Sequence, residues 1–384
     1  MLARATAHRG TWRDRRDLYR ESGVTVDPVS QAALGAVVGQ IAGHRHLGPK
    51  SAAVGAAAGL LPDIDVLFSI NGDYFDQLVL HRGITHSLFF APVVGPVLGW
   101  AVWAWERRRS RDRPPDRGRL YAWMWVAGLA LLSHPLLDYL TPYGTQLLLP
   151  FTDTRFAINA MPIIDPVYTL ALLIGLFVSR RVPRHALRVA AITLALSSAY
   201  LGYGWHLNEA AAQEARRQLE AEGVEPVRLA AFPTVLQVHY RRVVARTAQQ
   251  DRVGFISMWE PCAIDWGTAP RIHPAQTQAF LGAREGRIYD WFSMGWAHYE
   301  SARDGDTHIL RAHDLRYGMD NNPANSLFTA QMVHQLGAAP TFTSQSPMSS
   351  PSQRALSLGK LFADTYAPWC RMRGGFEPVA GSPL

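Results

Sequence analysis

The apolar residues of this chain are concentrated in its first half, and this uneven placement limits the folds that the chain can adopt. Residues 29–206 contain nearly all the long apolar runs of the 384-residue sequence, whereas residues 207–384 have the mixed composition of a soluble domain. The overall hydrophobic content of 48% hides this contrast. Because a helix needs about 20 apolar residues to cross the hydrocarbon core of a bilayer, the first half is predicted to lie in a membrane.

The apolar stretches of this half differ in length. Four of them are predicted to cross the bilayer, although the third needs the residues just before it to reach a spanning length: residues 84–105, 120–140, 167–178 and 186–205. Two shorter stretches, residues 30–43 and 51–61, are rich in Gly and Ala and are expected to form a tight helical hairpin, because small residues let backbones approach. The expected fold is a membrane all-α helical bundle of about six helical segments, the first two short.

Basic residues in the connections between these segments predict the orientation. One connection holds Arg45 and Lys50, residues 107–119 hold seven arginines, and residues 180–188 hold four more. An up-and-down path places these connections on one side, which the positive-inside rule makes cytoplasmic. Such short loops are membrane anchors, so no nucleic-acid partner is expected. The second half would then face outward, although six arginines in residues 1–28, a segment without the apolar core of a signal peptide, oppose this orientation.

The second half is expected to be a smaller α+β or mostly-β soluble domain. Residues 207–223 are predicted to form a polar linker helix, and the domain proper would occupy residues 224–384. Alternating or β-branched runs predict strands, and a Ser/Thr/Pro-rich run, residues 341–351, predicts a loop. The strand predictions cover residues 234–244, 253–259 and 287–292. Cys262 and Cys370 permit one disulfide without requiring it.

Ionisable residues cluster at the ends of the apolar segments. The sequence reads Leu-Pro-Asp-Ile-Asp at residues 61–65, His-Arg-Gly-Ile-Thr-His-Ser at residues 81–87 and Ser-His-Pro-Leu-Leu-Asp at residues 133–138. Asn159 and Asp165 precede the fifth segment. An up-and-down path brings all four groups to the same membrane face. Because burying charged groups in a bilayer is costly, such groups tend to mark a functional or paired interior site.

The residue types in these groups suit a divalent metal ion. His134 and Asp138 are four residues apart, so a helix projects both from one face. Imidazole mixed with carboxylate suits zinc, manganese or iron, with zinc the first choice. The predicted metal ligands number five, which allows one ion with supporting carboxylates or two ions: Asp63, Asp65, His86, His134 and Asp138.

Simpler interpretations stay open for several of these positions. The two aspartates after Pro62 also suit a turn, and the pair on the later helix also suits an intrahelical hydrogen bond. Asp165 before a proline suits a helix N-cap, and Asn159 suits a turn. Arg82 suits either an interfacial anchor or a binding group for a substrate anion. Four histidines of the second half, which lack ligand spacing, are expected at the surface or in the core: His239, His298, His308 and His313.

Taken in order, the three motifs and the run from Asp27 to Gly35 resemble the YdjM family of membrane-bound metal-dependent hydrolases. The resemblance covers residues 27 to about 170, with weaker likeness in residues 232–234 and 314–318. Some family members carry a histidine where this chain has Gln31, so a ligand from that position stays open, and Asp27 is a candidate in its place, with an N-cap of the first helix as its other interpretation. Gln31, Asp27, Asn159 and Asp165 are thus the additional candidate ligands. The family is distantly similar to helical zinc phosphodiesterases of the phospholipase C and nuclease P1 kind, which implies ester or phosphoester chemistry.

The resulting hypothesis is a hydrolase of the bacterial-type inner membrane, with its soluble domain on the outer face. His81 is the candidate general acid or base, and Arg82 is the candidate binding group for a substrate anion. A lipid or phosphoester substrate follows from the location alone. Two alternatives remain: a non-enzymatic membrane protein with a structural metal site, and a metal or proton transporter. The sequence leaves the oligomeric state open.

Overall fold

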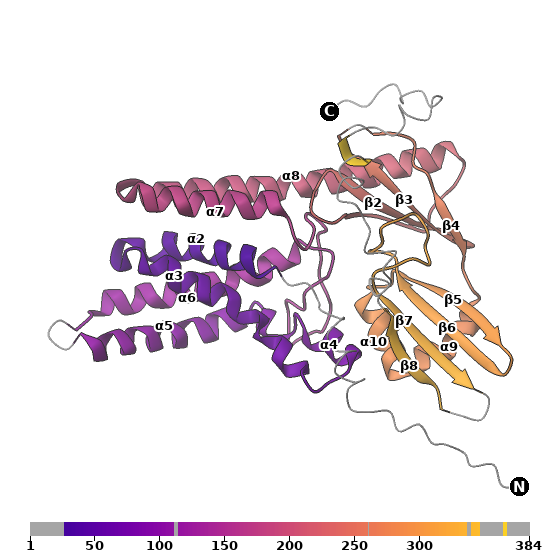
Figure 1. Cartoon of the computed structure of the whole chain (residues 1–384), viewed down its shortest axis with the longest axis horizontal. Coiled ribbons are helices and arrows are strands. Elements are labelled where there is room, and N and C mark those ends of the chain that lie inside the picture. Colours follow the sequence, from indigo (N-terminus) through magenta and orange to yellow (C-terminus); the bar gives the residue numbers. More distant parts are fainter. Residues whose placement is uncertain (1–26, 111–113, 260, 336–338, 346–363, 367–384) are drawn as a thin grey trace, which may run out of the picture.

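The computed structural model of the chain describes residues 27–110, 114–259, 261–335, 339–345 and 364–366. Within these residues a helical region is followed by a region of two antiparallel sheets, as the sequence predicts (Figure 1). The expected basic segment, residues 1–28, lies almost entirely outside the described residues. The fold therefore separates into a membrane-type bundle and a domain beyond one of its ends.

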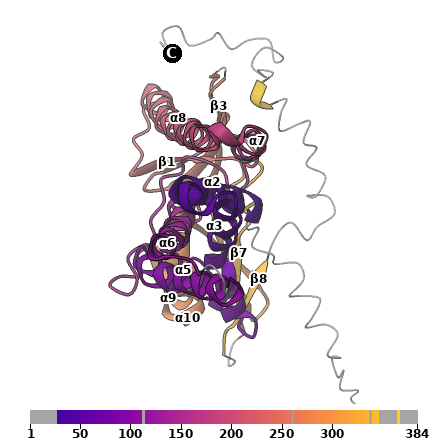
Figure 2. The same ribbon diagram turned by 90° about the vertical axis from the view of Figure 1, so that its left-hand side faces the viewer.

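The helical region consists of long helices joined by short ones. In chain order these are α2 (Pro28–Leu47), α3 (Lys50–Leu60), the 3-10 helix η1 (Leu61–Ser69), α4 (Tyr74–Leu80), the 3-10 helix η2 (Ile84–His86), α5 (Phe90–Arg109), α6 (Arg117–Tyr139), α7 (Pro166–Arg181), the 3-10 helix η3 (Pro183–His185) and α8 (Ala186–Ala221). Viewed along the bundle, α2 and α3 lie between the α7–α8 pair and the α5–α6 pair (Figure 2). The central position of α2 and α3 brings their ends close to α6.

The predicted small-residue hairpin is confirmed by the packing of α2 against α3. A Cβ atom added at Gly35 would lie 2.4 Å from the carbonyl oxygen of Gly55, and one added at Gly39 would lie 2.7 Å from the carbonyl oxygen of Ser51. Real side chains do not fit at such distances. Glycine at these positions therefore allows the two backbones to touch, which is how helices associate closely where lipid surrounds them.

The spanning helices differ from those that the sequence predicts. Within the described residues three helical runs are long and apolar enough to cross a membrane, or four if one bent pair counts as a single span. The first of these runs, Lys50–Ser69, joins α3 to η1 and is longer than expected. In contrast, the predicted span at residues 167–178 is the 16-residue helix α7, which is too short for a typical bilayer. The count of six segments, four of them spanning, is thus corrected.

The bent pair corrects a second prediction, because residues 84–105 do not form one straight helix. The axis bends by 64° between the segment Tyr74–His86 and α5. At the bend the Leu88 N–H donates to the Leu147 carbonyl oxygen (2.9 Å), and the Ser87 hydroxyl donates to the Leu149 carbonyl oxygen (2.5 Å). These contacts with a distant loop, and not the local composition, delay the start of α5 to Phe90.

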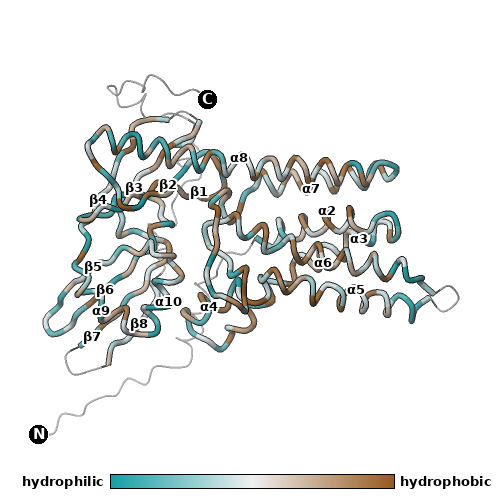
Figure 3. Tube along the Cα trace, turned by 180° about the vertical axis from the view of Figure 1, so that it is seen from behind, coloured by the Kyte–Doolittle hydropathy of each residue, from teal (hydrophilic) through white to brown (hydrophobic). Residues whose placement is uncertain are grey.

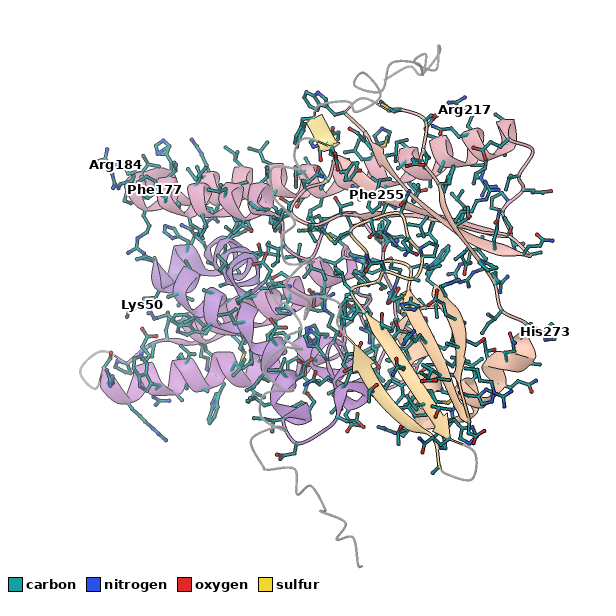
Figure 4. The ribbon with its side chains drawn as sticks, turned by 45° about the vertical axis from the view of Figure 1, so that its right-hand side comes forward. Lys50, Phe177, Arg184, Arg217, Phe255 and His273 are labelled. Carbon is teal, nitrogen blue, oxygen red and sulfur yellow. The ribbon has the colours of Figure 1, made fainter. Side chains whose placement is uncertain are left out.

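The basic connections gather at the end of the bundle that lies farthest from the sheets. Arg119 donates to the His46 carbonyl oxygen and pairs with Glu106, whose carboxylate lies 3.7 Å from the Lys50 ammonium. Lys50 and Arg184 are seen at this end in Figure 4. The helix ends there are hydrophilic, whereas the middle of the bundle is hydrophobic (Figure 3). This arrangement agrees with the predicted sidedness of the basic loops.

The second region contains two four-stranded antiparallel sheets, with strand orders β1-β2-β3-β4 and β5-β6-β7-β8. Helix α8 continues out of the bundle and packs on the first sheet through Ala211 and Ala215. The elements are β1 (Arg228–Pro233), β2 (Tyr240–Arg246), β3 (Gln250–Ser257), β4 (Gly267–Pro270), α9 (Pro274–Gly282), α10 (Arg284–Phe292), β5 (Ala297–Asp304), β6 (Thr307–Asp314), β7 (Thr329–Gln335) and β8 (Thr341–Gln345).

Two of the local predictions for this region are wrong. Residues 287–292, expected as a strand, belong to α10, where Tyr289 and Phe292 are fully buried one helical turn apart and pack with Phe280. Residues 341–345, expected as loop, form β8, because their backbone pairs with β7. In both cases tertiary packing overrides the local composition. Cys262 is disulfide-bonded, and Cys370 lies outside the described residues.

Buried arginines join the two regions. The Arg241 guanidinium, on β2, donates to the carbonyl oxygens of Ala160 (3.0 Å) and Gly204 (2.6 Å). Arg316, which follows β6 and pairs with Asp314, donates to the Pro142 carbonyl oxygen (2.8 Å). Because these buried side chains of the second region bond to backbone oxygens of the helical region, the sheets are held against one end of the bundle.

Candidate metal centre

The first two predicted ligands are carried by η1, which continues α3 without a break. Pro62 stands in its first turn, where proline is tolerated. The Asp65 side chain is 1% exposed and the Asp63 side chain is 14% exposed. Both carboxylates contact histidines of the cluster, so the two aspartates after the proline are more than turn residues.

The second motif reaches the cluster through a tight turn. His81 follows α4, and His86 ends η2. Between them Arg82 has φ +58°, a left-handed conformation that is uncommon for a residue other than glycine. This turn directs the Arg82 N–H to the Asp65 carboxylate (2.8 Å), while the Gln146 N–H donates to the Arg82 carbonyl oxygen (3.1 Å). The unusual backbone is thus fixed by two buried hydrogen bonds.

The third motif lies in the last turns of α6. His134 and Asp138, four residues apart, face the same side, as the spacing predicts. The Nδ1 atom of His134 lies 2.6 Å from the carbonyl oxygen of Gly59, so Nδ1 carries the proton and Nε2 presents a lone pair. The close packing of α3 makes this contact available. The helix hairpin therefore positions a ligand that belongs to another helix.

Four donor atoms from three segments lie close together. The Nε2 atoms of His86 and His134 are 3.0 Å apart. Asp63 Oδ1 lies 3.5 Å from the His86 Nε2 atom and 3.3 Å from the His134 Nε2 atom. Asp138 Oδ2 lies 3.2 Å and 3.5 Å from the same two atoms. Ligands about 2.0–2.1 Å from a tetrahedral zinc ion are separated by about 3.3–3.4 Å, so Asp63, His86 and His134 have the spacing of three ligands of one ion.

The chemistry of the donors also fits a cation. The Nδ1 atom of His86 lies 3.2 Å from Asp65 Oδ2, which leaves its Nε2 as a lone pair facing that of His134. Both oxygens of Asp63 and Oδ2 of Asp138 are buried without a hydrogen-bond donor. Lone pairs and carboxylates that face one another in a buried site repel unless a positive ion lies between them. The described residues therefore form a site suited to a divalent metal.

Neighbouring side chains hold the ligands in place. Asp65 accepts hydrogen bonds from the His81 imidazole (3.0 Å) and the Thr85 hydroxyl (3.2 Å), besides its contact with His86. Asp138 Oδ1 accepts from the Arg82 guanidinium (3.0 Å) and from the Gln31 amide (3.1 Å), which leaves Oδ2 for the centre. Such supporting partners fix the orientation of metal ligands. Asp65 and Gln31 thus act as orienting groups in this geometry.

Three candidate residues do not join the cluster. The Asp27 carboxylate accepts from the backbone N–H of Ser30 and caps α2. Asp165 caps α7 and accepts from the Tyr200 hydroxyl (2.8 Å). Asn159 adopts φ +60° in a turn. Among the described residues, none of these three side chains bonds to a ligand, so the capping and turn interpretations hold for them.

Two aromatic and cationic neighbours were missed by the sequence reasoning. The ring of Tyr143 lies 5.5 Å from the His81 ring, and the guanidinium groups of Arg82 and Arg155 lie 4.8 and 5.0 Å from its centre. Among the residues that the structure describes, Arg155 donates only to the carbonyl oxygens of Leu78 and Gly144, and burial lowers its pKa to about 10. Its loop has no motif from which a position beside the cluster follows.

Three of the four candidate histidines of the second half lie in the sheets. His298 and His313 are buried, as the interpretation of a core position predicts, and His298 contacts the Asp251 carboxylate (2.8 Å). His308 is exposed on β6. His239 lies among aromatic rings near the membrane end of α8, 3.1 Å from the Tyr203 hydroxyl. Within the described residues the candidate metal ligands belong to the helical region.

The fold and the cluster define a membrane protein with a buried histidine–aspartate site at one end of its helical bundle. The family model "YdjM inner membrane protein" matches residues 26–211, which include every member of the cluster. The chain belongs to the YdjM inner membrane protein family. The resemblance noted in the motifs is thereby confirmed, although the comparisons do not bear on hydrolysis.

Two curated proteins are similar to part of the chain. Inner membrane protein YbcI of Escherichia coli (strain K12) is 32% identical over 130 residues, which cover 33% of this chain and 69% of that protein. Uncharacterized protein YfhP of Bacillus subtilis (strain 168) is 29% identical over 140 residues, 35% of this chain and 37% of that protein. No solved structure matches the chain significantly.

Proposed function

We propose that this chain is a membrane-embedded metal-dependent hydrolase that uses water to cleave an ester or a phosphoester. The observation that carries the proposal is the group of Asp63, His86 and His134, which Asp138 Oδ2 also contacts. Beside it lies an Asp65–His81 pair whose outer nitrogen has no hydrogen-bond partner among the described residues. A divalent ion, zinc or else manganese or iron, would supply Lewis acidity and lower the pKa of water toward neutrality when bound there. The cluster would hold one ion, or two if Asp63, Asp65 and His81 take a second.

The side chains around the cluster suit proton transfer. Asp65 Oδ1 accepts from Nδ1 of His81, so Nε2 of His81 carries a lone pair. That Nε2 atom is buried and has no hydrogen-bond partner in the described part of the chain, which makes it the candidate proton acceptor. Arg82 is engaged with Asp138 and Thr141, so its first task is to position a ligand. Binding of a substrate anion by Arg82 remains a prediction.

A structural metal site is the second candidate, because four protein ligands are the number that closed zinc sites use. Two features favour the hydrolase. The Asp63 side chain is 14% exposed although its two oxygens are buried, so the centre lies close to the surface of the bundle, and His81 places an unbonded nitrogen beside the ligands. A purely structural metal site requires neither of these two features. Transport would require access from both faces, which neither feature supplies.

The test is hydrolysis of bis-p-nitrophenyl phosphate and p-nitrophenyl acetate by metal-reconstituted full-length protein in detergent. Asp138→Ala should abolish turnover, and His81→Gln should lower it about 100-fold while the metal content is kept. His308→Gln, at an exposed position on β6, is the matched control and should leave activity unchanged. A wild type with tightly bound metal but no turnover on a panel of esters and phosphoesters would favour the structural site.

A further inference from the structure

The segments that carry the ligands are apolar on their outer side. In η1 and at the residue after it, five large apolar side chains are between 41% and 65% exposed: Ile64, Val66, Leu67, Phe68 and Ile70. The only charged residues of η1, Asp63 and Asp65, turn inward to the histidines. A segment that faced water would show the opposite pattern. Since η1 belongs to the candidate span Lys50–Ser69, lipid is the natural cover for this face.

The neighbouring segments also expose large apolar side chains. Ile84 on η2 is 47% exposed, and Phe89 and Phe151 are 45% and 78% exposed. The last two rings pack edge to face at 5.1 Å, and the Leu88–Leu147 backbone contact holds their segments together. The apolar surface around the cluster is therefore continuous with the lipid-facing surface of the bundle.

The cluster lies nearest to this apolar surface at Asp63, whose two carboxylate oxygens are themselves buried. Among the four donor residues, the Asp63 side chain is the most exposed at 14%, while the side chains of His86 and His134 are 0% exposed. Asp63 is followed at once by the exposed Ile64. A substrate that reaches the centre here must pass along η1 at the level of the lipids.

Cationic groups lie next to the cluster in the interior. Arg82 and Arg155 both pack on the Tyr143 ring, and the groups that act most strongly on Arg155 include two further arginines, Arg82 and Arg316. Within the described residues Arg155 has no carboxylate partner. A buried guanidinium without a counter-charge favours an anion nearby. The surroundings thus combine an apolar outer wall with a cationic interior.

We propose that the substrate is an anionic membrane lipid whose phosphate-bearing headgroup reaches the cluster past η1 while its tails stay in the bilayer. This proposal rests on the proposed hydrolase function. It follows from the apolar exposure of η1, the position of Asp63 on that segment and the unpaired Arg155. Glycerophospholipids and polyprenyl phosphates share this chemistry.

The activity test compares a lipid with a soluble substrate. Proteoliposomes that contain phosphatidylglycerol or a polyprenyl phosphate report lipid hydrolysis, and bis-p-nitrophenyl phosphate reports the chemistry alone. The double variant Leu67→Ser/Phe68→Ser should lower lipid hydrolysis about ten-fold and change soluble turnover less than about two-fold. The control pair Ile192→Ser/Leu196→Ser, equally exposed on α8, should change neither. Equal losses on both substrates, or hydrolysis of the soluble substrate alone, would overturn the proposal.

A binding test separates this proposal from the proposed function. Phosphatidylglycerol with a photoactivatable group on its acyl chain should label residues 61–70 of wild type and of Asp138→Ala. Unlabelled phosphatidylglycerol should compete, whereas neutral diacylglycerol should not, and competition by polyprenyl phosphate distinguishes the two lipid sources. Headgroup-dependent labelling without turnover would refute the hydrolase alone. Labelling that both competitors reduce equally would refute the anionic lipid substrate even if the enzyme is active.

Discussion

The Nε2 atoms of His86 and His134 lie 3.0 Å apart although the residues are separated by 48 positions in the sequence. Each ring is oriented by a contact of its own Nδ1 atom. The Nδ1 atom of His86 faces Asp65, and that of His134 faces the Gly59 carbonyl oxygen. Two lone pairs held toward each other in this way require a positive charge between them. This relationship is the basis of the first two predictions.

The first prediction concerns metal content. Purified wild-type protein should contain near-stoichiometric zinc, manganese or iron by mass spectrometry, and His86→Ala and His134→Ala should lose it, because each variant removes one ligand. His308→Gln should keep the metal, since that residue is exposed on β6. Full metal content in both ligand variants would show that the cluster is not the binding site.

The second prediction separates orienting groups from ligands. Asp65 accepts from two imidazoles, from Thr85 and from a backbone N–H, and therefore has little capacity left for a metal. Asp65→Asn should weaken metal affinity about 10–100-fold, as changes of supporting partners do. Asp63→Asn should lower occupancy much further, because Asp63 has no other partner. Competition with a chelator measures both affinities. Equal loss in the two variants would make Asp65 a ligand.

Much of the bundle and the cluster could be predicted because both depend on local signals. The lengths of the apolar runs, the small residues and the basic loops reflect whether lipid or water surrounds each segment, so they can be recognised in the sequence. The spacing of His134 and Asp138 places both on the same helix face. The break before α5 could not be predicted, since its cause is hydrogen bonding of Ser87 and Leu88 to a loop about 60 residues away. The shortness of α7 follows from the chain turning at Asp165.

The roles of individual site residues depend on contacts that no local pattern encodes. Asp63 and Asp65 look equivalent in the sequence, and only the packing of His81 and His86 distinguishes a ligand from an orienting group. Asp165 shares the membrane face of the cluster but is used as a helix cap. The position of Arg155 beside Tyr143 depends on the fold of a whole loop.

The third prediction concerns the close contact of α2 and α3. A Cβ atom at Gly55 would lie 2.3 Å from the Gly35 carbonyl oxygen and 2.9 Å from the Gly39 Cα atom, so Gly55→Ala must push two backbones apart. We expect the free energy of unfolding to fall by about 1–3 kcal/mol, seen as a lower thermal unfolding midpoint in detergent. Metal content should fall as well, because Gly59 on the same helix orients His134.

Gly202→Ala is the matched control for this substitution. Gly202 is exposed on α8, and an added Cβ would meet no atom within 4 Å. Alanine there should leave the midpoint unchanged or raise it slightly, because alanine favours helix by about 1 kcal/mol over glycine. A Gly55→Ala protein as stable as wild type would mean that the helices do not touch as described.

The fourth prediction concerns pH. Burial on β6 lowers the pKa of His313 to about 4, with Glu300, His298 and Arg311 as charged neighbours and Thr329 as its hydrogen-bonding neighbour. Near pH 6.5 His313 binds a proton in the unfolded chain but not in the folded domain. The free energy of unfolding is therefore unaffected by this group above pH 6.5 and falls as the pH drops toward 4. The resulting decrease in the free energy of unfolding has an upper bound of roughly 3 kcal/mol.

Thermal unfolding of the full-length protein between pH 7.5 and 4.5 measures this effect. Wild type should lose stability across that range, and His313→Gln should flatten part of the decline because the titrating group is gone. His308→Gln removes an exposed histidine from the same strand and should keep the wild-type profile. Parallel profiles for wild type and His313→Gln would show that His313 titrates as it does in the unfolded chain.

The fifth prediction concerns orientation in the membrane. The connection between α5 and α6 belongs to the basic end of the bundle, where Arg119, Glu106 and Lys50 meet, and the positive-inside rule makes that end cytoplasmic. The metal cluster and both sheets then lie on the outer side, an oxidising location that suits the disulfide at Cys262. An epitope inserted after Gly305, in the exposed β5–β6 turn, should be removed by protease in intact spheroplasts. An epitope inserted after Ser110 should be removed only after lysis. The reverse pattern would place the cluster at the cytoplasmic face, and a lipid substrate would then come from the inner leaflet.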